Sequence, residues 1–246
     1  MSLWIKICGN TTLTDAQLAA DAAADAVGFV FAPSPRRVTP AQAASIIPHL
    51  PATLENIGVF VDASFDEIAS TVETAGLTGV QLHFEASPKL SSQIRDRFGA
   101  DLRILRVVHF PSTKIAEDTG LVSGHDFSRA ENDPNNEKGA LASEPIFSDP
   151  CIDAILVDSR TATAVGGTGK TFDWSLAANT LFQKEKMRKH LIAAGGLTPD
   201  NVAEAIATLH PWGVDVVSGV ESAPGRKDPA KVRAFIANAR AASKTP

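Results

Sequence analysis

The first strand-like segment of the chain carries a thiol and an ammonium group. Residues 3–9 read Leu-Trp-Ile-Lys-Ile-Cys-Gly, an apolar run with one lysine inside it. Side chains alternate along a strand, so Lys6 and Cys8 are expected to share one face. An unpaired lysine is costly to bury, and a neighbouring ammonium favours the thiolate form of a cysteine. The segment therefore predicts a reactive thiolate at Cys8, although a free cysteine is more often a small buried hydrophobe.

Acidic and imidazole side chains end four later apolar runs. They are Asp62, His83, His109 and Asp158. Such groups are candidates for an active site, because the strand ends of a parallel sheet meet at one edge. Their meeting there is a consequence of the architecture, and the chain lacks the other spacings that metal ligands show, so no metal is expected.

Eight apolar runs would position these groups. They start near Leu3, Ala26, Asn56, Gly79, Leu102, Ala154, His190 and Gly213. Their spacing leaves room for a helix between consecutive strands, which predicts parallel pairing. Amphipathic spacing supports helices around residues 65–72, 90–98 and 232–239. We predict an α/β fold, a single-domain (β/α)8 TIM barrel over residues 1–246, with a doubly wound open sheet as the alternative.

The first and last strands of such a barrel are neighbours. Asp215 interrupts the eighth apolar run as Lys6 interrupts the first. Each charge alone would be expensive to bury, so we expect the two side chains to pair inside the barrel.

Helix starts are marked by a capping residue followed by proline, which loses nothing at the first helical position. The pattern occurs at Thr39-Pro40, Ser87-Pro88, Thr198-Pro199 and Asp228-Pro229. Ser64 and Glu67 form a capping-box pattern at a further start. Every one of these starts follows a predicted strand, as the alternating fold requires.

Glycines follow the last two predicted strands, in Ala194-Gly195-Gly196-Leu197 and Ser218-Gly219-Val220-Glu221. Glycine lets backbone amides approach an anion closely, and phosphate sites after strands seven and eight recur in this barrel. We therefore expect Gly195, Gly196, Ser218 and Gly219 to bind a phosphate. The alternative is that these glycines form tight turns only.

Residues 165–171, Val-Gly-Gly-Thr-Gly-Lys-Thr, end like a nucleotide-binding loop. That motif requires a glycine five residues before the glycine of Gly-Lys, where this chain has Ala164. We predict instead a loop that closes over substrate and brings Gly166 and Gly167 to it, with a plain surface turn as the alternative.

Residues 111–150 break the regular spacing. They hold eight acidic and three basic side chains, so their net charge of −5 equals that of the whole chain. We predict an irregular acidic insertion between strands five and six, with an active-site lid as the alternative.

The composition favours a soluble enzyme of the cytoplasm. The 246 residues are 44% hydrophobic, without an apolar run of membrane-spanning length or the pattern of a signal peptide. The net charge of −5 argues against a general nucleic-acid surface. The two cysteines, Cys8 and Cys151, are expected to stay reduced.

Nine motifs extend nearly from end to end of the chain: Lys6-Ile7-Cys8-Gly9, Gly28-Phe29-Val30-Phe31, Ser34-Pro35-Arg36-Arg37-Val38, Gly58-Val59-Phe60-Val61, Val80-Gln81-Leu82-His83, Leu156-Val157-Asp158, Gly166-Gly167-Thr168-Gly169-Lys170-Thr171-Phe172-Asp173-Trp174, Ala194-Gly195-Gly196-Leu197 and Ser218-Gly219-Val220-Glu221. In this order and spacing they resemble the phosphoribosylanthranilate isomerase family of tryptophan biosynthesis. Two features depart from the family pattern. Phe84 stands where a glycine is usual, and residues 111–150 are longer than the usual connection.

The resemblance implies an Amadori rearrangement of N-(5-phosphoribosyl)anthranilate to 1-(2-carboxyphenylamino)-1-deoxyribulose 5-phosphate, without a cofactor. It implies that Asp158 is the general acid that opens the furanose ring and that Cys8 is the base that removes the proton at C2. A water-poor site raises the pKa of a carboxyl group, which suits the first role. Arg36 is implied to lie beside the anthranilate, where a guanidinium can pair with its carboxylate or stack on its ring.

Gln81 and His83 are predicted to share an inward face, where structural hydrogen bonding and substrate contact are both open. The expected partner is a small phosphorylated substrate, not a nucleic acid or a membrane, and the chain is expected to be a monomer or a homodimer. Two rival functions remain. Cys8 argues against the histidine-pathway isomerase that uses two aspartates, and Cys8 with Asp158 disfavours a silent metabolite sensor, because phosphate binding requires neither.

Overall fold

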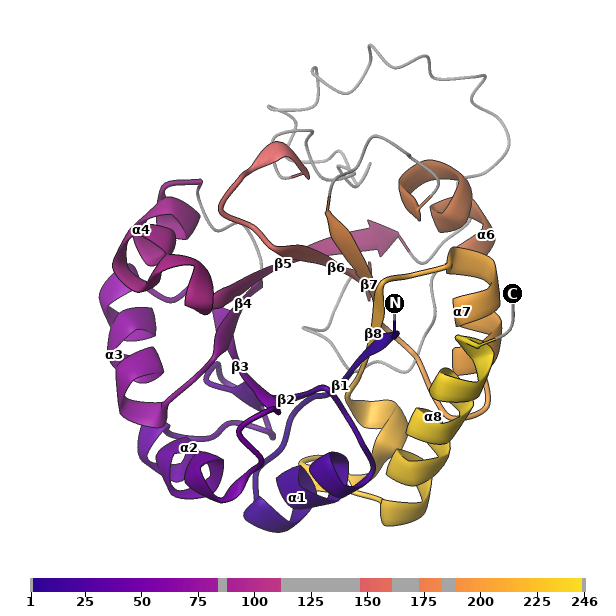
Figure 1. The fold of residues 1–246 in the computed structure, drawn as a ribbon, viewed down its shortest axis with the longest axis horizontal. Helices are drawn as coiled ribbons and strands as arrows, with labels where there is room; N and C mark the ends of the chain where they lie inside the picture. Colours follow the sequence, from indigo (N-terminus) through magenta and orange to yellow (C-terminus); the bar gives the residue numbers. More distant parts are fainter. Residues whose placement is uncertain (1, 84–87, 112–146, 161–172, 183–188, 245–246) are drawn as a thin grey trace.

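Eight parallel strands close into a barrel in which each strand pairs with the next and β8 pairs with β1 (Figure 1). The computed structural model describes residues 2–83, 88–111, 147–160, 173–182 and 189–244. The strands are β1 (Trp4–Ile7), β2 (Ala26–Val30), β3 (Glu55–Val61), β4 (Gly79–His83), β5 (Arg103–Pro111), β6 (Ala154–Arg160), β7 (His190–Ala193) and β8 (Gly213–Val216). Every predicted start lies within one residue of the observed one. The predicted TIM barrel is thus confirmed, and the open sheet is wrong.

Helices surround the barrel along its outer face (Figure 1). They are α1 (Leu13–Asp21), α2 (Pro40–Ile46), α3 (Phe65–Ala75), α4 (Pro88–Phe98), α6 (Trp174–Ala177), α7 (Val202–Leu209) and α8 (Pro229–Ala242), with the short turns η1 (Ile47–His49), η2 (Gly99–Asp101), η4 (Ala178–Phe182) and η5 (Ser218–Val220). A small antiparallel hairpin, β9 (Glu221–Ala223) with β10 (Arg226–Lys227), follows η5 and was not foreseen.

The predicted helix starts are confirmed at three positions. Thr39 and Ser64 form capping boxes at α2 and α3, and the Asp228 carboxylate accepts two backbone hydrogen bonds at the start of α8. The start predicted at Thr198-Pro199 is wrong, because α7 begins at Val202. There the backbone amide of Thr198 donates to Oδ1 of Asn201, so residues 199–201 form a turn that precedes the helix. Ser87 lies outside the described residues.

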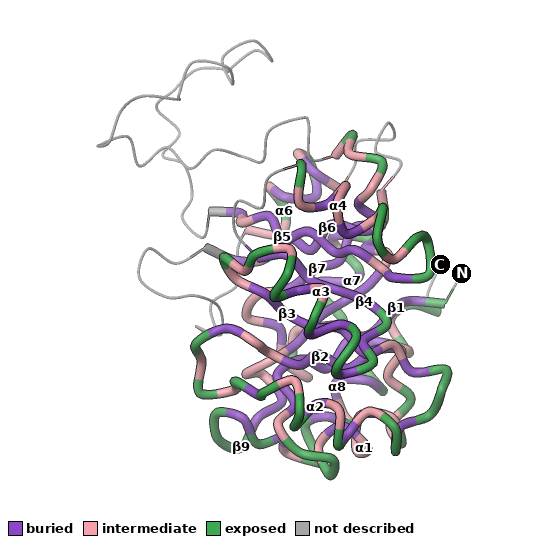
Figure 2. Tube along the Cα trace, turned by 90° about the vertical axis from the view of Figure 1, so that its left-hand side faces the viewer, coloured by how far each residue is buried: buried purple, intermediate pink, exposed green. Residues whose placement is uncertain are grey.

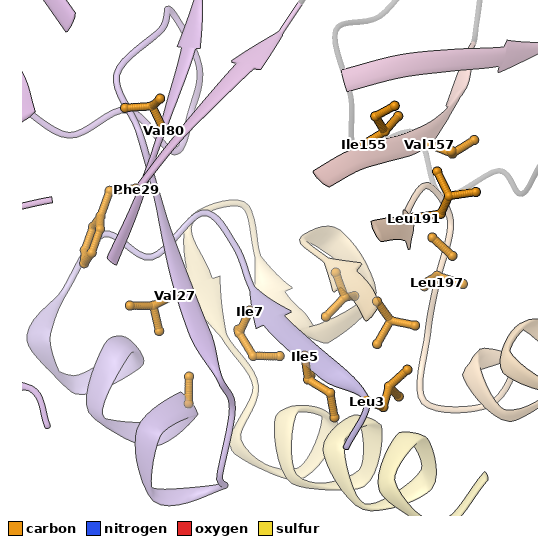
Figure 3. Packing of buried hydrophobic residues seen from close by; sticks show 14 of the residues in the cluster. Leu3, Ile5, Ile7, Val27, Phe29, Val80, Ile155, Val157, Leu191 and Leu197 are labelled. Atoms are coloured by element: carbon orange, nitrogen blue, oxygen red, sulfur yellow. The ribbon is translucent and has the colours of Figure 1, made fainter. Parts of the chain in front are cut away.

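Alternating strand residues fill two separate layers of core. Residues that point outward pack against the helices, among them Ile5 and Ile7 of β1 with Val27 and Phe29 of β2 (Figure 3). Residues that point inward make a smaller cluster in the barrel, which consists of Trp4, Ala26, Ile57, Leu105, Val107, Ala154, Leu156, Ile192 and Ala194. Buried positions run along the barrel strands that Figure 2 labels, β1 to β7. This inner apolar cluster fills the barrel interior. The polar side chains described below lie toward the carboxyl ends of the strands.

The predicted insertion at 111–150 remains a prediction, because residues 112–146 lie outside the described part of the chain. Within that part, the structure has no helix long and apolar enough to cross a bilayer.

Candidate active site

Cys8 follows β1 at the carboxyl end of the barrel and is 3% exposed. Its backbone amide donates to the Val216 carbonyl of β8, and the chain then turns at Gly9, which has a φ of 75°. The thiol lies against Gly28 of β2, where a built Cβ would collide with Sγ. A glycine inside β2 is therefore what makes room for the thiol, and the sequence analysis gave Gly28 no such role.

Lys6 forms a fully buried ion pair directly below Cys8. Its Nζ lies 2.8 Å from Oδ1 of Asp215, its register partner in β8, so the predicted pair is confirmed. The same Nζ donates to Oε1 of Gln81 at 2.7 Å. For Gln81 the sequence left structural hydrogen bonding and substrate contact open; the structure shows the hydrogen bond to Lys6, and substrate contact stays a prediction.

The pKa of Cys8 corrects one expectation. Lys6 and Lys227 do lower the pKa of the thiol, but burial raises it more, and the Asp215 carboxylate adds to the rise. The pKa therefore lies above its ordinary value, and the free site holds a thiol. The predicted thiolate fails because the loss of solvent around Cys8 outweighs the charge of the Lys6 ammonium.

Asp158 lies in β6 opposite His109 of β5, and the pairing of these two strands continues for two residues beyond both. Burial raises the pKa of Asp158 to about 6, and the negative charge of Asp215 adds to the shift, while Lys6 opposes it. Lys6 and Asp215 thus act on both Cys8 and Asp158. The pKa values of Cys8 and Asp158 are therefore set in part by the same two charges.

The two histidines at this end lie together. The rings of His83 and His109 meet edge to face with their centroids 5.0 Å apart. Burial, His109 and Lys6 lower the pKa of His83 to about 4, so its imidazole is neutral near pH 7. Asp62, with a φ of 51°, is exposed. In the described part of the chain, no three His, Cys, Asp or Glu side chains are grouped as metal ligands.

Arg36 lies over the turn that follows Cys8, with its Cδ 2.9 Å from a Cβ built on Gly9. Its Nε and Nη2 donate to the two oxygens of Glu221 at 2.8 and 2.7 Å. Among the described residues, none accepts a hydrogen bond from Nη1. Glu221 therefore holds the edge of the guanidinium formed by Nε and Nη2, and among the described residues none holds Nη1.

The glycine loops after β7 and β8 touch one another. Gly195 and Gly196 have φ values of 78° and 66°, and a Cβ on Gly195 would collide with Oδ1 of Asp158. A Cβ on Gly219 would overlap the carbonyl oxygen of Leu197. The left-handed glycines confirm tight turns and leave phosphate binding as a prediction. Gly166 and Gly167 lie outside the described residues.

Sequence comparison relates the chain to characterised enzymes along nearly all of its length. A family model described as N-(5'phosphoribosyl)anthranilate (PRA) isomerase matches residues 5–125 and 136–238. The N-(5'-phosphoribosyl)anthranilate isomerase of Pelobacter propionicus is 41% identical over 94% of this chain and 93% of its own. That of Bacillus cereus is 39% identical over 98% of this chain and 99% of its own. Residues 126–135, which the family model leaves out, lie within the predicted insertion.

Solved structures agree with the sequence relatives. The phosphoribosyl anthranilate isomerase of Thermotoga maritima has a TM-score of 0.76 and 34% identity, covering 97% of this chain and 99% of that one. A phosphoribosyl anthranilate isomerase in complex with reduced 1-(o-carboxyphenylamino)-1-deoxyribulose 5-phosphate has a TM-score of 0.72 and 31% identity, with the same coverage.

Proposed function

The chain belongs to the N-(5'-phosphoribosyl)anthranilate isomerase family, and we propose that it converts N-(5-phosphoribosyl)anthranilate to 1-(2-carboxyphenylamino)-1-deoxyribulose 5-phosphate in tryptophan biosynthesis. The observation that supports this most is that the carboxyl end of the barrel holds both a buried thiol, Cys8, and a carboxyl group of raised pKa, Asp158. Opening a sugar ring requires an acid, and removing a proton next to an imine requires a base. Asp158 can supply the acid, and Cys8 can supply the base.

Asp158 is the proposed general acid. Protonation of the furanose oxygen lets the C1–O bond break while the anthranilate nitrogen forms an iminium with C1. A carboxyl group with a pKa of about 6 still carries its proton in a useful fraction of molecules near neutral pH. Burial and the Asp215 carboxylate raise this pKa, so both help Asp158 to act as the proposed acid.

Cys8 is the proposed general base. Its thiolate takes the proton from C2 of the iminium, which gives an enolamine that becomes the ketose when C1 gains a proton and the hydroxyl group on C2 loses one. The iminium carries a positive charge next to C2, so bound substrate adds to the effect of Lys6 and Lys227 and favours the thiolate. No cofactor enters these steps.

Arg36 is the proposed receptor for the anthranilate carboxylate. Glu221 holds its Nε and Nη2, so the Nη1 side is the edge that can accept another carboxylate. Neutral His83 lies at the same end of the barrel and is proposed to contact the substrate.

The direct test is to add the purified protein to phosphoribosylanthranilate and to follow the anthranilate-type fluorescence together with formation of the ketose. We expect the fluorescence to fall as the ketose appears. A well-folded protein that forms no ketose would contradict the proposed function.

Phosphate binding by the loops after β7 and β8 has its own test. We expect Gly196→Val to raise KM at least tenfold, because the side chain would block the approach of a phosphate to the backbone amides around Gly195, Gly196, Ser218 and Gly219. Valine is strained at a φ of 66°, so a matched control is needed.

Gly76 supplies this control. It ends α3 with a φ of 73°, and the nearest atom to a Cβ built there, Cγ2 of Ile47, is 4.0 Å away, which is ordinary van der Waals contact. We expect Gly76→Val to lower the melting temperature about as much as Gly196→Val while KM stays unchanged. Equal KM values for both variants would exclude the phosphate site.

A further inference from the structure

Glu221 and Lys227 form a buried charge cluster with Arg36 beside Cys8. The carboxylate of Glu221 is 4% exposed, and the side chain of Lys227 is fully buried. Both come from the short hairpin of β9 and β10, and neither takes part directly in the proton transfers proposed above. Two ionised groups at this depth are costly, so their presence calls for an explanation.

Glu221 is bound so that its position is fixed. Its Oε1 accepts hydrogen bonds from Nε of Arg36 at 2.8 Å, from the Gly225 amide at 3.2 Å and from Nζ of Lys227 at 3.3 Å. Its Oε2 accepts from Nη2 of Arg36 at 2.7 Å. The planar guanidinium meets this carboxylate through two bonds, which sets its orientation as well as its distance.

Among the described residues, Nζ of Lys227 donates to three hydrogen-bond acceptors. Its Nζ donates to the Cys8 carbonyl at 2.5 Å, to the Val217 carbonyl at 3.3 Å and to Glu221. An ammonium has three protons to donate, so three acceptors satisfy the charged form completely, whereas a neutral amine would have one proton too few. Burial lowers the pKa of Lys227, and the Glu221 carboxylate opposes that shift.

The charges of the cluster decide what Arg36 can do. A guanidinium paired with one carboxylate is neutral as a pair and has little attraction left for another anion. With Lys227 present, the three groups sum to one positive charge, and the free edge of Arg36 is where that charge is open to a ligand. Lys227 thus offsets Glu221 and leaves Arg36 able to bind an anion.

We propose that Glu221 and Lys227 are positioning residues that hold Arg36 in one orientation and keep its cluster positive, so that its Nη1 edge receives the carboxylate on the aromatic half of the substrate. This inference rests on the proposed function, and it adds two residues that touch no substrate themselves. Lys227 also donates a hydrogen bond from the hairpin to the Cys8 carbonyl. This bond links the cluster that holds Arg36 to the backbone of Cys8.

The test compares two ligands. One is reduced 1-(o-carboxyphenylamino)-1-deoxyribulose 5-phosphate, and the other is the same molecule without the ring carboxylate. Calorimetric titration is expected to show that Lys227→Met weakens binding of the carboxylated ligand about tenfold and changes binding of the other ligand less than about twofold. Arg226→Met is the matched control, because it removes an equal charge from the exposed neighbouring position and is expected to leave both affinities unchanged.

A double variant separates charge from structure. In Lys227→Met with Glu221→Gln, Arg36 again carries one uncompensated positive charge, and glutamine keeps an acceptor for it. We expect affinity for the carboxylated ligand to recover to within about threefold of wild type. A purely structural role predicts that the double variant binds more weakly than Lys227→Met alone, for both ligands.

The outcomes distinguish this inference from its premise. If the unmodified protein bound both ligands equally, carboxylate recognition by Arg36 would be wrong. If it preferred the carboxylated ligand and Lys227→Met kept that preference, or if the double variant failed to recover, the role given to Glu221 and Lys227 would be overturned while the isomerase proposal stood.

Discussion

Asp158→Asn and Cys8→Ser are each expected to lower kcat by about 10²- to 10⁴-fold while affinity for the reduced product analogue stays close to that of the unmodified protein. Asparagine cannot deliver a proton to the furanose oxygen, and a serine hydroxyl is a far weaker base than a thiolate. Binding of the two ends of the ligand is assigned, in the proposed function, to Arg36 and to the glycine loops, none of whose residues is replaced in either variant. Steady-state rates and calorimetric titration of both variants check this. Wild-type kcat in either variant would show that the assigned role is wrong.

The pH dependence of kcat/KM separates loss of an acid from general damage to the site. The proposed mechanism requires protonated Asp158 and the Cys8 thiolate, whereas the pKa of Asp158 is about 6 and that of Cys8 lies above its ordinary value. Below this pKa Asp158 keeps its proton, so kcat/KM rises with pH as thiolate forms. Above it, each gain in thiolate is offset by loss of the Asp158 proton, and the profile becomes flat until the thiol titrates.

The Asp158→Asn variant lacks that offset. Its residual kcat/KM is therefore expected to keep rising through pH values near 6 as the thiolate forms. A bend that persisted at the same pH in this variant would assign the titration to another group. Cys8→Ser supplies the complementary comparison, because its residual rate should no longer follow the thiol.

The sequence predicts the barrel well because its signals are local. An apolar run, a capping residue and a proline are all read within a few residues, and the repeated spacing leaves few topologies. The failure at Thr198 has a local cause as well. The Thr198 amide donates to Oδ1 of Asn201 in a turn over residues 199–201, so the regular helix begins three residues later than predicted, at Val202.

The sequence predicts the contacts of charged residues that interrupt apolar runs. It predicts less well the pKa values, which depend on how deeply a group is buried. Lys6 and Asp215 each interrupt an apolar run, so pairing them follows from cost alone. The pKa of Cys8 is a balance between burial and three charges, and a sequence shows the charges without the burial. Glu221 and Lys227 belong to a short hairpin whose contacts with Arg36 and the Cys8 carbonyl span much of the chain.

Lys6→Met is expected to destabilise the fold by about 3–5 kcal/mol, because it leaves the Asp215 carboxylate buried without its cation. The same change is expected to raise the pKa of the Cys8 thiol further, since Lys6 is the first of the charges that lower it. Chemical denaturation measures the first effect, and the pH dependence of thiol alkylation measures the second.

The two effects separate in the double variant Lys6→Met with Asp215→Asn. Removing both charges relieves the uncompensated carboxylate, so most of the lost stability is expected to return. The thiol pKa should fall back as well, because Asp215 raises it and Lys6 lowers it. The pKa of Asp158 should fall in the double variant relative to Lys6→Met for the same reason, since Asp215 raises that pKa too. A thiol whose titration did not respond to Lys6→Met would show that the ion pair supports the barrel and has no part in setting the strength of the base.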